Sequence, residues 1–173
     1  LQTPASWPPP LMSQVRKRFG ISPLGNEEPR LFTARELLAT RDRCIRSVES
    51  AASVARALLR SEPWDLLLLG LAATHRAGHQ LWDQANLVGE ATPWQANELA
   101  SALRKVYVAC DAAVGRLVSE VGPGTTILVF ALHGMGPNVS RCEVLGEMLS
   151  RILAGEGDGR DGREDRRLPW ARL

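Results

Sequence analysis

Three histidines are the residues of this chain best suited to chemistry, and each follows the C-terminal end of an apolar run. His75 and His79 lie four residues apart in LLLLGLAATHRAGHQLWD, residues 66–83, and His133 follows a second run in FALHGMGPN. Imidazole is a common ligand for zinc and suits several other transition metals. If the two runs are neighbours, the three imidazoles predict one divalent-metal site. In the alternative, each histidine only hydrogen-bonds to the backbone of its loop.

The two apolar runs, WDLLLLGLA and TTILVFAL, predict buried strands at residues 65–71 and 126–132. An unbroken apolar run of this length is typical of a strand covered on both faces, as in a parallel sheet. The β-branched residues of the second run favour the same interpretation. For the first run, a short buried helix is the alternative.

Three helices are expected around these runs. A long helix over residues 34–61 begins with a capping box of Thr33 and Glu36 and carries an apolar stripe at spacings of three, four and seven. A second helix, over residues 93–120, begins with a similar pair in TPWQ. A third, over residues 141–153, begins with a third capping box in SRCE. The N-terminal LMSQVRKRFG also suits a short helix that ends at its glycine.

The order helix, strand, helix, strand, helix predicts an α/β fold, with a parallel-sheet core and flanking helices. Ligands of such sheets gather beyond the carboxyl ends of the strands, so both histidine loops are expected at one edge. We expect an irregular segment over residues 1–30, the α/β core over residues 31–154, and a disordered or linker tail over residues 155–173.

Composition limits the classes of function. The net charge is +2 and 45% of the residues are hydrophobic, so a globular protein that binds neither nucleic acid nor a membrane is expected. The three cysteines are far apart and form no CxxC pair, which favours reduced thiols and a cytoplasmic location. The longest apolar run is about a third of the ~20 residues that span a bilayer.

Residues 64–138 resemble the alkaline phosphatase superfamily, most closely its type I phosphodiesterase/nucleotide pyrophosphatase branch. Members carry D-x-x-G-H after one strand and S-D-H-G-M after a later one. A helix with the pattern Y-x-x-x-D-x-x-[IV]-G lies between them. This sequence has HRAGH, then ALHGM, and the helix pattern falls on Tyr107, Asp111, Val114 and Gly115.

The resemblance implies two metal ions, usually zinc, that hold a phosphate or sulfate ester for attack by a Ser or Thr nucleophile. His79 matches the histidine of the first motif and His133 that of the second. His75 stands where the first motif has Asp, and it can still bind a metal. Leu132 stands where the second motif has Asp, and it cannot. No residue of this chain fills the nucleophile's place.

Two functions are therefore expected from the sequence. The first is part of a metal-dependent phosphoric or sulfuric ester hydrolase-like protein that acts on a small ester, with a fragmentary alkaline phosphatase-like fold. The second is a non-catalytic ligand-binding or interaction protein on the same fold. A start at Leu1 favours a fragment, whereas Leu132 favours divergence; whether the chain is an enzyme stays open.

Overall fold

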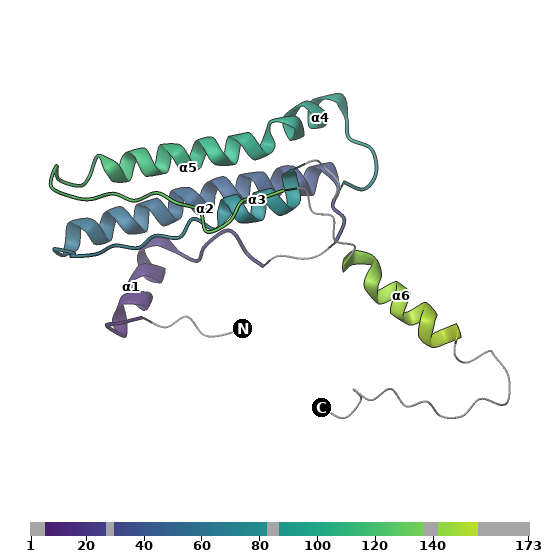
Figure 1. Ribbon diagram of the computed structural model, residues 1–173, viewed down its shortest axis with the longest axis horizontal. Coiled ribbons are helices and arrows are strands. Elements are labelled where there is room, and N and C mark those ends of the chain that lie inside the picture. Colours follow the sequence, from purple (N-terminus) through teal and green to yellow (C-terminus); the bar gives the residue numbers. More distant parts are fainter. Residues whose placement is uncertain (1–5, 27–29, 83–86, 137–141, 156–173) are drawn as a thin grey trace. The chain divides into compact units, whose positions relative to one another are not determined.

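The computed structural model describes residues 6–26, 30–82, 87–136 and 142–155. By its internal contacts the chain forms two units, residues 1–139 and residues 140–173. The described part contains six helices, coloured along the sequence in Figure 1. They are α1 (Pro10–Phe19), α2 (Ala34–Ser61), α3 (Ala73–Leu81), α4 (Pro93–Ala100), α5 (Ala102–Val118) and α6 (Cys142–Gly155).

Helix α2 is the centre of the first unit, and its predicted extent is confirmed. The Thr33 hydroxyl accepts the backbone N–H of Glu36, and the Glu36 side chain accepts the backbone N–H of Thr33, which completes the capping box. The apolar stripe faces α5, α3 and α4. The buried residues of α2 are Ala34, Leu37, Leu38, Thr40, Cys44, Val48, Ala52 and Ala55.

The second predicted helix is present as two helices, α4 and α5, which meet at Ser101. The capping box at its start is confirmed, with Thr92 as the cap and Gln95 as its partner. Ser101 has φ −106° and ψ 0°, and this local break separates the two helices. Helix α5 lies along α2 (Figure 1) and buries Ala102, Val106, Cys110 and Ala113.

The first and last helices also lie where the sequence predicts them. Helix α1 ends at Gly20, whose φ of 78° is accessible to glycine at little cost. In the second unit, α6 occupies the predicted place, but the cap expected at Ser140 lies outside the described residues, as does the predicted tail beyond residue 155. The division of the chain at residues 30 and 154 stays a prediction.

The predicted α/β fold with a parallel-sheet core is wrong. The described residues are helical and contain no strand, and their only β-type contact is an isolated parallel bridge between Phe32 and Leu87. Both apolar runs follow irregular paths (Figure 1), and among the described residues no backbone hydrogen bond joins either run to another segment. Parallel strands are stable in sheets of several strands with both faces covered, and two runs alone do not provide this.

The two runs nevertheless follow the same direction along α2. The first starts near Trp64, whose Nε1 donates to the Leu58 carbonyl at the end of α2. The second starts after Glu120, which pairs with Arg60 at the same end. One run leads into α3, and the other brings His133 to α3. Both leave large apolar side chains in solvent: Leu66, Leu68, Leu128, Val129, Phe130 and Leu132.

No described helix is both long and apolar enough to cross a membrane.

The first capping box makes the stability of α2 sensitive to acid. The backbone N–H of Thr33 lowers the pKa of Glu36 from 4.5 to about 2, and hydrogen bonds from Arg30 and the Thr33 hydroxyl act in the same direction. Because the folded-state pKa lies below the unfolded value, this stabilisation is complete above pH 4.5 and is lost as the pH falls towards 2.

We therefore expect the thermal unfolding temperature of the chain to fall between pH 4.5 and pH 2, and to fall less steeply in Glu36→Gln. Glutamine still closes a capping box but does not titrate. Circular dichroism melts at intervals across this range measure the effect. Equal decreases in the unfolding temperature of the two proteins over this pH range would contradict the expectation.

Candidate metal site

The three histidines converge on α3. The sequence predicts a loop around His75 and His79, but both lie on a helix, where a spacing of four places them on one face. Their ring centroids are 4.3 Å apart. The His133 ring lies edge-on to His75 with a centroid distance of 5.7 Å. The predicted convergence therefore occurs beside a helix and without a sheet edge.

A glycine on α3 allows the two histidine motifs to meet. Gly78 lies on the buried side of α3, and a Cβ there would be 2.7 Å from Cε and 3.2 Å from Cγ of Met135. The glycine of the first motif thus makes room for the methionine of the second. This contact holds the segment after His133 against α3.

Solvent reaches the histidine cluster. His75 and His133 are exposed and His79 is half-buried. Nδ1 of His133 lies 2.9 Å from the Gly134 carbonyl oxygen, and because a carbonyl only accepts, this bond places the proton on Nδ1. Nε2 of His133 is then the nitrogen with a lone pair available for a ligand.

Carboxylates do not complete the cluster. Leu132 takes the place of the second motif's aspartate, and its side chain is 90% exposed. Within the described ranges, no group of three His, Cys, Asp or Glu side chains is arranged to hold a metal ion. The cluster thus has donors of the right type, but in this arrangement they do not form a metal site.

The position of α3 depends on a residue whose role the motifs do not indicate. Arg76 is buried, and its guanidinium donates to the carbonyls of Asn26 at 2.8 Å, Gly25 at 3.3 Å and Leu24 at 3.4 Å. Hydrogen bonds from a charged donor are stronger than those between neutral groups. This side chain therefore fastens the turn at residues 24–26 to α3.

A second polar cluster lies at the C-terminal end of α2. One carboxylate oxygen of Glu120, Oε1, accepts from Arg56 and from Arg60, and Oε2 accepts from Nε of Arg60. These hydrogen bonds, that of Arg60 first, lower the pKa of Glu120. Sequence patterns do not reveal this cluster because its members come from α2 and from the segment after α5.

Comparison with known proteins matches residues 14–160 to the family described as type I phosphodiesterase / nucleotide pyrophosphatase. No curated protein and no solved structure matches the chain. The match covers most of the sequence, which places the chain in the alkaline phosphatase superfamily. Within it, the chain belongs to the type I phosphodiesterase/nucleotide pyrophosphatase family, as its motifs predict.

Proposed function

We propose that this chain is a phosphoric ester hydrolase-like protein in which His75, His79 and His133 bind one divalent metal ion, zinc by preference, with low affinity. We further propose that residues 1–173 alone do not hydrolyse a phosphodiester. The observation that supports the metal site is the approach of the three rings at α3. The family match supports small phosphate esters as the substrates.

The ring geometry is compatible with one shared zinc. With Zn–N bonds near 2.1 Å and tetrahedral angles, two imidazoles on one zinc have centroids roughly 5 Å apart. The observed separations, 4.3 Å and 5.7 Å, lie on either side of that value, so ring rotations and small shifts would suffice. Bound there, zinc would polarise an ester oxygen.

The residues do not fit the two-metal centre of the family. A catalytic zinc commonly has three protein ligands and one open position, and three histidines provide no more than one such set. Leu132 contributes no ligand to a second ion. Among the described residues, no Ser or Thr side chain is placed as a nucleophile beside the histidines, so no hydrolytic step follows from them.

The non-catalytic alternative, a ligand-binding or interaction protein of the same family, is favoured by one observation. Leu132 stands at the position of the motif's aspartate and therefore provides no metal ligand. Its side chain is exposed, so the core does not require a leucine there. A turnover measurement separates this alternative from an enzyme. The cytoplasmic location and the choice between phosphate and sulfate esters stay predictions.

The test is a zinc titration by calorimetry. We expect one weak zinc per chain, and we expect His79→Ala or His133→Ala to lower the affinity by about tenfold or more. Thr74→Ala is the matched control: it lies on the same helix, and its hydroxyl only donates to the Leu71 carbonyl. Its zinc affinity is expected to equal that of the wild type.

Turnover of a chromogenic phosphodiester, with and without zinc, completes the test. We expect no rate above background. Tight binding of two zinc ions, or activity that disappears in His79→Ala, would show that the chain holds ligands beyond the three histidines. Unchanged zinc binding in both histidine variants would exclude the metal site.

A further inference from the structure

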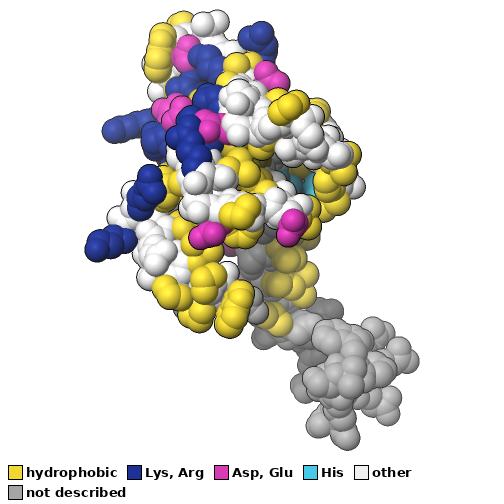
Figure 2. Space-filling model, turned by 90° about the vertical axis from the view of Figure 1, so that its left-hand side faces the viewer, with side chains coloured by type: hydrophobic (Ala, Val, Ile, Leu, Met, Phe, Trp, Pro, Cys, Tyr) yellow, Lys and Arg dark blue, Asp and Glu magenta, His cyan; other side chains and the backbone are white. Residues whose placement is uncertain are grey.

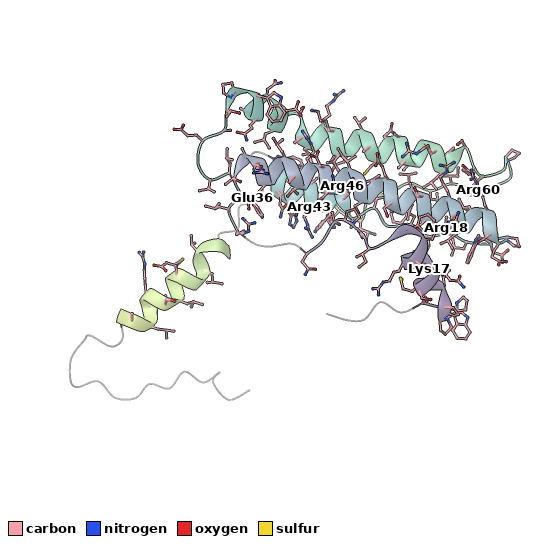
Figure 3. All side chains as sticks on the ribbon, turned by 180° about the vertical axis from the view of Figure 1, so that it is seen from behind. Lys17, Arg18, Glu36, Arg43, Arg46 and Arg60 are labelled. Carbon is pink, nitrogen blue, oxygen red and sulfur yellow. The ribbon has the colours of Figure 1, made fainter. Side chains whose placement is uncertain are left out.

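A small cavity lies between α1 and the C-terminal end of α2, and arginines dominate its lining. Its volume is about 310 Å³, and the lining residues are Arg18, Phe19, Ser53, Arg56, Ala57, Arg60 and Ser61. No acidic residue is among them. Figure 3 shows Arg18 and Arg60 near each other at this end of α2. Figure 2, which faces the same end of the unit, shows Lys and Arg side chains along one side of it, with Asp and Glu side chains among them.

The charges around the cavity do not cancel. Three guanidinium groups line it. Within the part of the chain that the structure describes, the carboxylate that pairs with them is that of Glu120, which binds Arg56 and Arg60 from outside the lining. Arg18 lies over the ring of Phe19, 5.1 Å from its centroid. The pairing therefore leaves an excess of positive charge that a dianion would neutralise.

The arginines are also held in place before any ligand arrives. Glu120 is largely buried and fixes two guanidiniums through both of its oxygens, while the Phe19 ring supports the third. Holding flexible side chains in this way reduces the entropy lost on binding. Guanidinium groups match phosphate oxygens with paired hydrogen bonds, and the cavity has room for a small anion.

We propose that this cavity binds the phosphate group of a small soluble molecule, with Arg18, Arg56 and Arg60 as its ligands. The inference is independent of the histidine cluster, since no histidine lines the cavity. The opposing interpretation is that the arginines serve only to anchor Glu120 and the end of α5. The two differ in the expected role of Arg18, which does not pair with Glu120.

The probe is inorganic phosphate, titrated into the full chain by calorimetry in the presence of EDTA, so that no metal-bound phosphate contributes. We expect saturable binding that sodium chloride at equal ionic strength does not reproduce. Arg18→Gln should weaken binding by roughly tenfold. Arg18→Lys, which keeps the charge but loses the paired geometry, should fall between it and the wild type.

Arg46→Gln is the matched control. Arg46 is an exposed arginine like Arg18, but it lies on α2 outside the cavity lining (Figure 3). It should bind phosphate as the wild type does. Equal losses in Arg18→Gln and Arg46→Gln would show a general charge effect and overturn the proposal, as would no loss in Arg18→Gln. Binding to phosphatidate vesicles without binding to free phosphate would also overturn it. Melting curves of each variant establish that the fold is retained.

Discussion

Replacing Leu132 with aspartate is expected to raise the zinc affinity of the chain by between about tenfold and a hundredfold. The new carboxylate would stand directly beside His133, which already approaches His75. Partners that only orient a metal ligand are worth roughly 10- to 100-fold in affinity, so a direct ligand should be worth at least about as much. The change disturbs little packing, because the Leu132 side chain is 90% exposed.

Leu128→Asp is the control for this gain. Leu128 belongs to the same run and is also exposed, at 80%, but it lies five residues before His133. Calorimetry should show wild-type zinc affinity for Leu128→Asp and an increase for Leu132→Asp. If both variants gain equally, added negative charge explains the result. If neither gains, the His133 ring does not belong to a metal site.

Leu37→Ala is expected to lower the free energy of unfolding by about 3 kcal/mol. Leu37 is fully buried on α2, within the core that α2 shares with α3, α4 and α5. The substitution removes apolar contacts and leaves a cavity that the surrounding helices fill only in part. Chemical denaturation followed by circular dichroism measures the loss.

The companion substitution Leu68→Ala compares the contribution of the apolar runs to the unfolding free energy with that of the helical core. Leu68 is the same residue type but is 79% exposed. A surface change of this kind is expected to alter the unfolding free energy by no more than about 0.5 kcal/mol. A loss comparable to that of Leu37→Ala would mean that the first run is packed in solution, contrary to the described structure.

Local signals account for the parts of the fold that the sequence predicts. The capping boxes at Thr33 and Thr92 and the apolar stripe of α2 act within one or two turns of chain, and the structure reproduces them. The spacing of His75 and His79 fits a helical turn, yet α3 is short and has no side-chain cap, so no local signal marks its start.

The predicted sheet fails because a strand is defined by its partner. Residues such as Ile127 and Val129 favour extended backbone, but sheet formation also requires a neighbouring backbone for hydrogen bonds and a cover for each face. Neither requirement is encoded in the run itself. Here Leu71 of the first run packs against the helical core, whereas every residue of the second run is exposed.

The histidine cluster and the arginine-lined cavity also differ in how far the sequence predicts them. Their positions after apolar runs identify the three histidines, the motif resemblance supports His79 and His133, and the structure brings the three rings together. Arg18 and Arg60 carry no motif, and they meet only because α1 returns to the far end of α2. An overall net charge of +2 conceals such a local excess, since acidic residues elsewhere balance it.

The exposed run from Ile127 to Leu132 has a consequence for the behaviour of the chain in concentrated solution. Its six residues carry no charge and no proline, and their backbone groups have no partner among the described residues. Short uncharged segments of high β-propensity are those that stack between molecules into cross-β aggregates. We therefore expect this segment, together with the exposed leucines of the first run, to limit the solubility of the chain. Co-solvents that weaken intermolecular β-stacking should raise that limit more than changes of pH around neutrality, because the segment carries no charge.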